Sequence, residues 1–183
     1  KSVFSQREVG VHATGFGPAL RAAIREDADV ILVGEMRDYE TISLALTAAE
    51  MGALVFGTLH TNGAAKTIDR VIDAFPADEQ PQARLSLSES LAGGVSQQLL
   101  RTSDGKGRCA ANEILIRTSG LANVIREGNT PMLLNIIQSG KSQGMQTMDD
   151  ALMALVQGNR IVPEDAYRKA IDKARFEKFA PAD

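Results

Sequence analysis

Two short apolar runs, each followed by polar side chains, stand out in the first third of the chain. Residues 30–33 read Val-Ile-Leu-Val and lead to Glu35, and residues 53–56 read Ala-Leu-Val-Phe and lead to His60. Between them, residues 39–51 space their apolar side chains as a helix with one buried face does. A strand, a helix and a strand in so short a span predict two parallel strands joined by a right-handed crossover.

Glu35 and His60 would leave such strands at the same edge of the sheet. Ligands of open α/β sheets bind at the carboxyl ends of the strands, and a buried strand ending in Gly-Glu is typical of nucleotide hydrolases that direct a carboxylate at water. Each residue alone has a structural explanation. Glu35 can belong to a strand end followed by a helix cap at Asp38, and His60 can be a hydrogen-bonded strand-end histidine. Their shared edge favours a catalytic pair.

The remaining pattern predicts helices, then a hairpin, then more helices. Helices are expected over residues 17–27, 63–73 and 78–91. Two strands, 95–100 and 109–116, should flank the Gly-rich turn 103–107. Further helices are expected over residues 121–127, 132–139, 147–157 and 164–173. The change to helical pieces places a boundary near residues 117–119. We therefore expect a core over residues 1–117, a small helical domain over residues 118–183, and a frayed tail over residues 180–183.

Composition limits the possible functions. A chain of 183 residues is long enough to bury a real core. Its net charge of −3 argues against nucleic acid as the main partner. The single cysteine, Cys109, permits neither an internal disulfide nor a Cys-rich zinc site, and its place predicts an inert strand residue. No apolar run approaches the ~20 residues that span a bilayer, so we expect membrane association only through a partner.

Several motifs carry a resemblance to a known family. The segment DVILVGEMRD (residues 29–38) resembles the Walker B box of the secretion-superfamily ATPases, and GTLHTN (residues 57–62) resembles their His box. Four segments are similar to the PilT-like retraction ATPases of type IV pili: AKTIDRVIDAFP (65–76), LSESL (87–91), LANVIRE (121–127) and GMQTMD (144–149). The resemblance implies an α/β fold, namely the C-terminal part of a RecA-like P-loop ATPase core followed by a small helical domain.

The phosphate-binding loop of that family does not occur in this sequence. No G-x-x-x-x-G-K-[ST] is present, and the acidic box that follows it in the family is also missing. Residues 15–18 (Gly-Phe-Gly-Pro) cannot replace the loop, because they lack the Lys-Ser/Thr pair and Pro18 removes an amide. We therefore expect a C-terminal fragment whose 183 residues bind ATP weakly or not at all and do not hydrolyse it. One side of the sheet near residues 30–33 should be exposed.

The resemblance implies a role for each site residue. Glu35 would orient and deprotonate the attacking water, and His60 would sense the terminal phosphate. The residues expected to support the nucleotide site are Gly34, Arg37, Asp38, Thr58 and Thr61. Arg37 and Asp38 would mainly hold the loop in shape. ATP and Mg²⁺ are the implied cofactors, with their main ligands upstream of this chain, and no residue here is assigned as a metal ligand.

Exposed charges could serve contacts with other proteins. The residues that could face a neighbouring subunit are Arg21, Arg25, Lys66 and Arg70. The alternative is that they form solvated helix faces, on which the first two pair with Glu26 or Asp27. By the resemblance, Arg126 and Glu127 would serve retraction specifically. The alternative for them is an ordinary charged pair on a helix surface.

As a whole, the resemblance implies an ATP-hydrolysing subunit of a homohexameric motor that retracts type IV pili and powers twitching motility. Such a motor is cytoplasmic, lies at the inner-membrane base of the pilus and acts on the platform protein there. A paralogue of the retraction ATPase would carry the same motifs. Two other classes stay open: a non-catalytic ring or interaction module of the pilus machinery, and a metal-dependent hydrolase using His60, which no H-x-x-x-H spacing supports.

Overall fold

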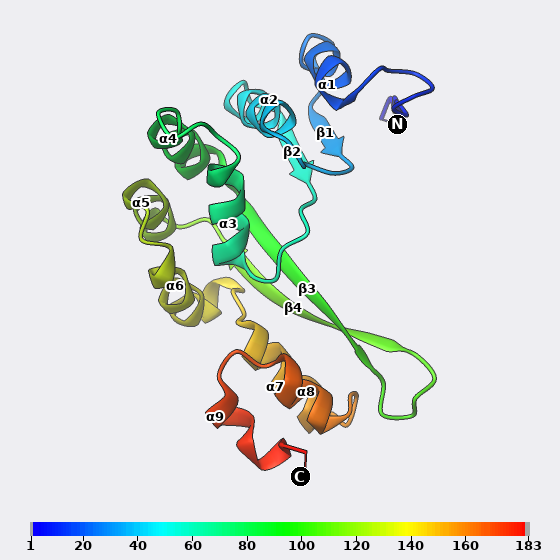
Figure 1. Cartoon of the computed structure of the whole chain (residues 1–183), viewed down its shortest axis with the longest axis vertical. Coiled ribbons are helices and arrows are strands. Elements are labelled where there is room, and N and C mark those ends of the chain that lie inside the picture. The colour runs from blue at the N-terminus through cyan, green and yellow to red at the C-terminus, as the bar shows by residue number, and fades with distance from the viewer. Residues whose placement is uncertain (1, 182–183) are drawn as a thin grey trace. The chain divides into compact units, whose positions relative to one another are not determined.

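The computed structural model describes residues 2–181 and divides into two compact units (Figure 1). The first unit comprises the chain up to His60 together with residues 70–90, and the second comprises residues 61–69 and the chain from Leu91 onward. The chain thus passes between the units directly after His60. Residues 182–183 of the expected frayed tail lie outside the described residues.

The first unit is built on two parallel strands. Its elements are α1 (Phe16–Ile24), β1 (Val30–Val33), α2 (Tyr39–Glu50), β2 (Leu54–Gly57) and α4 (Gln80–Ser90), while α3 (Ala64–Asp73) runs across the division. Val30 lies opposite Leu54, and Val33 lies opposite Gly57. The parallel pairing predicted from the two apolar runs is therefore confirmed.

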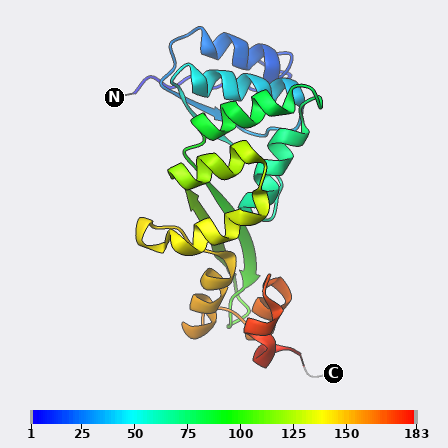
Figure 2. The ribbon, with the colours of Figure 1, turned by 90° about the vertical axis from the view of Figure 1, so that its left-hand side faces the viewer.

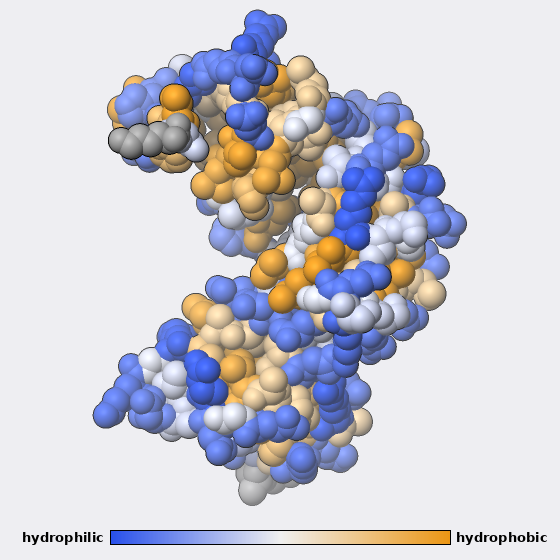
Figure 3. Space-filling model, turned by 180° about the vertical axis from the view of Figure 1, so that it is seen from behind, coloured by the Kyte–Doolittle hydropathy of each residue, from blue (hydrophilic) through white to orange (hydrophobic). Residues whose placement is uncertain are grey.

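Helices cover one face of this sheet and leave the other face exposed. Ile31 and Val33 share a core with Leu20 of α1 and with Ala45 and Ala48 of α2. The apolar side chains on the other face are exposed: Val30, Leu32, Leu54 and Phe56. Figure 3 shows apolar side chains gathered on the surface of this unit. Because strand side chains alternate between faces, the expectation of a buried strand is correct for half of β1 only.

The second unit is built on a long hairpin. β3 (Gly93–Arg101) and β4 (Arg108–Ile116) pair antiparallel from end to end, which confirms the predicted hairpin. The following helices are α5 (Ser119–Glu127), α6 (Leu133–Ser139), α7 (Met148–Gln157), α8 (Pro163–Lys169) and α9 (Lys173–Phe176), with 3₁₀ turns at Thr130–Met132, Lys141–Gln143 and Glu177–Phe179. In Figure 2 these helices follow one another along the hairpin.

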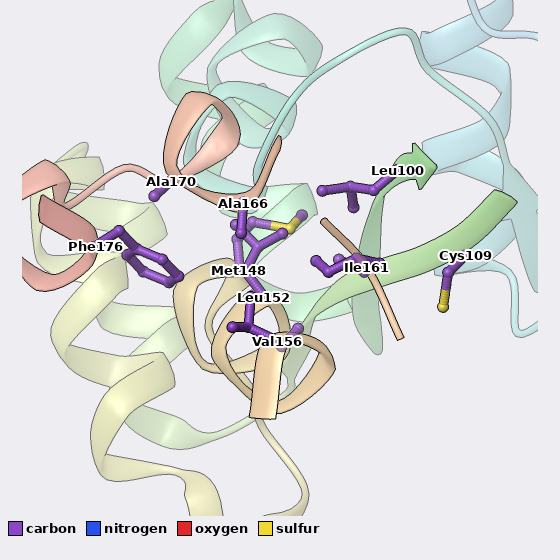
Figure 4. Close-up of a cluster of buried hydrophobic side chains, with 11 residues drawn as sticks. Leu100, Cys109, Met148, Leu152, Val156, Ile161, Ala166, Ala170 and Phe176 are labelled. Carbon is purple, nitrogen blue, oxygen red and sulfur yellow. The ribbon is translucent and has the colours of Figure 1, made fainter. Parts of the chain in front are cut away.

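The hairpin and the C-terminal helices share one apolar core (Figure 4). Leu100 of β3 and Cys109 of β4 lie in the same cluster as Met148 and Leu152 of α7 and Phe176 of α9. Cys109 is therefore a buried strand residue, as its sequence position predicts. The cluster explains why the C-terminal helices stay with the strands instead of forming a separate domain.

Two backbone hydrogen bonds also join β4 to the segment before α7. The Ile114 N–H donates to the Gln146 carbonyl at 2.8 Å, and the Gln146 N–H donates back at 3.0 Å. The compact units change along the chain after residues 60, 69 and 90, whereas the sequence pattern predicts a boundary near residues 117–119. The sequence pattern marks where strands give way to helices, but it does not show which helices pack on those strands.

Asp149 sets the path of the chain after α8. The single helix expected over residues 164–173 is interrupted at Ala170, whose backbone is extended (φ −60°, ψ 143°). The buried Asp149 carboxylate accepts the N–H groups of Ile171 and Asp172, each at 2.9 Å. It therefore replaces the acceptors that a continuous helix would have supplied, and a separate short helix, α9, follows.

We expect Asp149→Ala to destabilise the second unit by about 1–3 kcal/mol, because it leaves two backbone N–H groups without their acceptor. Urea denaturation of the chain, followed by circular dichroism, measures the change. Glu177→Ala removes an exposed carboxylate of the same unit and should change stability by less than about 0.5 kcal/mol. Equal denaturation midpoints for Asp149→Ala and the unaltered chain would contradict this role.

Candidate functional site

The carboxyl ends of β1 and β2 are joined beyond their last paired residues. The Met36 N–H donates to the Thr58 carbonyl at 3.0 Å, and the Thr58 hydroxyl donates to the Gly34 carbonyl. Glu35 stands between Gly34 and Met36, so its backbone is anchored on both sides. Its side chain therefore starts from a fixed point at this edge of the sheet.

Glu35 and His60 meet at this edge, as their positions after the two strands predict. His60 Nε2 lies 2.9 Å from Glu35 Oε1, and Arg37 Nε pairs with the same oxygen. The Glu35 side chain is 20% exposed, whereas those of His60 and Arg37 are 84% and 73% exposed. Within residues 2–181, no group donates a hydrogen bond to Oε2 of Glu35. One carboxylate oxygen thus has two partners, and the other has none among the described residues.

Arg37 favours the ionised form of this carboxylate. The hydrogen bond from Arg37 is the main cause of the lowered pKa of Glu35; partial desolvation opposes it, and the charges of Arg37 and His60 reinforce it. The same bond raises the pKa of Arg37. Glu35 is therefore ionised at neutral pH, which is the state that can accept a hydrogen bond or a proton from water.

The residues predicted to support the site divide into two groups. Three of them surround Glu35: Gly34, Arg37 and Thr58. Asp38 instead accepts the Thr41 N–H at 2.9 Å and caps α2, which confirms the structural explanation for this residue. Thr61 Oγ1 lies 2.6 Å from Thr67 Oγ1 of α3 and belongs to the second unit. These two side chains therefore shape the neighbouring helices.

The four basic residues predicted at a subunit interface are exposed: Arg21, Arg25, Lys66 and Arg70. Arg21 pairs with Glu40 of α2 at 2.5 Å. The alternative pairing with Glu26 or Asp27 is wrong, because Glu26 pairs with Arg7 and Asp27 lies beyond the end of α1 with a left-handed backbone (φ 55°). The charges of α1 thus connect it to other segments of the first unit.

Arg126 and Glu127 end helix α5 on its exposed side. Leu121 and Ile125 are the buried residues of this helix. The Arg126 guanidinium donates to Asn123 Oδ1 at 3.4 Å, one turn earlier, and both Arg126 and Glu127 are exposed. The pair is therefore accessible to a partner.

Glu113 is a further candidate that the sequence motifs did not single out. Its carboxylate is 4% exposed and accepts the Ala64 N–H, the first of α3, at 2.7 Å. A signal was available, because Glu113 occupies an inward position of β4 between the buried residues Ala111 and Leu115. An acid in an otherwise apolar row indicates a specific partner.

Residues 2–181 contain no group of three or more His, Cys, Asp or Glu side chains placed to hold a metal ion. None of the helices in this described part of the chain is long and apolar enough to cross a membrane.

We expect Arg37→Gln to raise the pKa of Glu35 toward its ordinary value of 4.5, because the main cause of the lowering is removed. Carboxyl carbon NMR of the chain during an acid titration measures this. The lowered pKa means that the ion pair stabilises the fold above the unfolded-state pKa and that this contribution is lost as the pH falls through the folded-state pKa.

Arg21→Gln is the matched control for this titration, because it breaks another exposed ion pair of the first unit, that with Glu40. It should leave the titration of Glu35 unchanged. If Arg37→Gln also left the titration unchanged, another group would have to hold the charge of Glu35.

Comparison with known proteins places this chain in a family. Residues 8–129 match the family model described as Type II/IV secretion system protein. The chain is 56% identical over 170 residues to the "Twitching motility protein" of Neisseria gonorrhoeae, covering 93% of this chain and 46% of that protein. It is 55% identical over 170 residues to the "Type IV pilus retractation ATPase PilT" of Pseudomonas aeruginosa, covering 93% of this chain and 49% of that protein.

Solved structures agree with these matches. The "Crystal Structure of the Pilus Retraction Motor PilT and Bound ADP" is similar with a TM-score of 0.85 and 46% identity, over 95% of this chain and 49% of that one. The chain spans about half the length of the curated relatives it matches. The predicted fold class, the C-terminal part of an α/β P-loop ATPase, is confirmed, as is the resemblance to the retraction ATPases. The chain belongs to the Type II/IV secretion system protein family.

Proposed function

We propose that this chain supplies the water-activating side of the ATPase site in a motor that retracts type IV pili and powers twitching motility. The observation that carries the proposal is the 2.9 Å contact between Glu35 and His60 at the edge where two parallel strands end. Relatives more than half identical to the chain bear the names of a twitching motility protein and a pilus retraction ATPase. We assign the ATPase activity to a protein of the full length of these relatives, of which this chain spans about half.

The groups at this edge fit a hydrated phosphate. The exposed His60 imidazole can donate to a phosphate oxygen, and Oε2 of Glu35 can accept from water. Apart from the two adjacent residues, no atom of the described chain lies within 4 Å of where a Cβ at Gly34 would stand, so a ligand can approach the backbone there. When bound, Mg·ATP would supply the transferred phosphoryl group and a cation that neutralises its charge. Their main ligands, the lysine and hydroxyl of a phosphate-binding loop, are assigned outside these 183 residues.

Glu35 orients the attacking water in this proposal. Phosphoryl transfer proceeds through a loose transition state, so the protein mainly positions groups and stabilises charge. The lowered pKa of Glu35 makes it a weak base that is always ionised at neutral pH. It therefore contributes first by fixing the water through a hydrogen bond, and accepts the proton as the new bond to phosphorus forms.

His60 senses the terminal phosphate. Its exposed ring can donate to Glu35 or to a phosphate oxygen, so its contact with Glu35 changes as the phosphate is gained and lost. Because the chain leaves the first unit directly after His60, this exchange reaches the second unit through the backbone.

The same proposal assigns the assembly and its partners. The motor is a homohexamer, and the exposed basic residues Arg21, Arg25, Lys66 and Arg70 lie toward neighbouring subunits. Arg126 and Glu127 serve retraction, and the partner is the platform protein of the pilus. The motor works in the cytoplasm at the inner-membrane base of the pilus, held there by that partner.

In the full-length protein, we expect Glu35→Gln to lower the rate of ATP hydrolysis by about 10²–10⁴-fold, because it removes a base while keeping the shape of the side chain. Nucleotide affinity should remain largely intact. A phosphate-release assay and calorimetric titration with Mg·ATP measure the two quantities. Hydrolysis within a few-fold of the unaltered protein would refute the assignment of Glu35 as the base.

We expect replacement of both Arg126 and Glu127 by alanine to spare most ATP hydrolysis but to abolish pilus retraction, because the pair lies on the exposed side of α5, outside the Glu35–His60 contact. Twitching motility of cells with normal protein levels is the measurement. Alanines at Glu177 and Lys178, an exposed pair of opposite charges in the same unit, should leave twitching intact. Normal twitching of the Arg126/Glu127 variant would make the pair an ordinary surface feature.

A further inference from the structure

A buried carboxylate holds the start of helix α3. Glu113 of β4 accepts the Ala64 N–H at 2.7 Å across 49 residues of sequence, and it is 4% exposed. The first N–H groups of a helix have no acceptor within the helix, and the positive end of the helix dipole favours an anion there. Burying a carboxylate is costly unless it is bonded, so this position demands a defined partner.

The short segment from His60 to Ala64 is fixed by further contacts. The Thr61 and Thr67 hydroxyls lie 2.6 Å apart, and the Thr67 hydroxyl donates to the Gly63 carbonyl at 2.9 Å. Gly63 has φ +120°, a conformation that residues with side chains rarely adopt. The backbone therefore enters α3 along one defined path.

The two ends of this segment are held in different units. His60 contacts Glu35 in the first unit, and Ala64, four residues later, bonds to Glu113 in the second. Four residues span at most ~14 Å even when fully extended, so a displacement of one end beyond that reach must move the other end.

We propose that Glu113 is a positioning residue for the ATPase reaction: it fixes the segment that carries His60 and so determines how His60 meets Glu35 and the phosphate. This inference rests on the proposed function. Glu113 acts through the first amide of α3, and the side chain that meets the reacting groups is His60. A residue that acts only through another should lose its effect when that other residue is removed, whereas a general loss of stability should not depend on His60.

The test is a double-mutant cycle in the full-length protein, with kcat, KM and nucleotide affinity measured for each variant. We expect Glu113→Ala to lower kcat about tenfold while nucleotide affinity stays within about twofold. In the His60→Ala background, Glu113→Ala should change kcat by less than about twofold. Glu113→Gln should retain most activity, because the amide oxygen can still accept the Ala64 N–H.

Asp149→Ala is the matched control. Asp149 is also a buried carboxylate that accepts backbone N–H groups in the second unit, but its partners are Ile171 and Asp172. It should lower the melting temperature as Glu113→Ala does, and any effect on kcat should multiply with that of His60→Ala.

Failure of the proposed function and failure of this inference give different results. If His60→Ala and Glu35→Gln both hydrolyse ATP normally, the proposed function fails. If those variants are impaired but the effect of Glu113→Ala multiplies with that of His60→Ala, Glu113 is structural only and this inference is overturned. If Glu113→Ala does not fold, Gly63→Ala disturbs the same segment through its φ of +120° and must show the same dependence on His60; a multiplicative effect there overturns the inference equally.

Discussion

The parallel register of β1 and β2 is the constraint on which the site depends. Val33 lies opposite Gly57, so the residues that follow each strand, including Glu35 and His60, emerge at one edge. A slip of one residue would turn the alternating side chains to the opposite face. The Met36 side chain occupies the space that a side chain at residue 57 would take, so Met36 and Gly57 pack closely at this edge. Antiparallel strands would have placed the acid and the imidazole at opposite ends.

Arg37 favours the ionised form of Glu35 but does not hold its side chain firmly. Its bond to Oε1 lowers the pKa of Glu35, but the guanidinium is 73% exposed, and an ion pair so open to solvent is weak and screened by salt. Both partners of Glu35 can therefore exchange it for another anion at little cost. In the proposed mechanism this matters, because an arriving phosphate competes for the same imidazole and the same guanidinium.

The sequence was sufficient where local pattern decides the outcome. Apolar alternation and turn residues predicted the strands and the hairpin, and the acid before α2 predicted its cap at Asp38. It was insufficient where one of many acids selects a distant partner. Arg21 bonds to Glu40 instead of a neighbour on its own helix, and Glu113 finds an amide 49 residues away. Periodicity shows that a position faces inward, but the partner depends on how the segments pack. The catalytic roles come from the resemblance and stay predictions.

The segment after β2 combines one exchangeable end and one fixed end. The contact of His60 with Glu35 is exposed, so its energy is small and depends on what else is bound. The bond of Glu113 to Ala64 is buried, where a hydrogen bond to a charged group contributes more and where its loss would leave a carboxylate without its partner. A segment held loosely at both ends would absorb a change at the site, and one held rigidly at both would prevent it. With loose attachment at the phosphate side and firm attachment at the helix side, the proposed mechanism lets a change at His60 reach α3 through this segment, and a change at α3 reach His60.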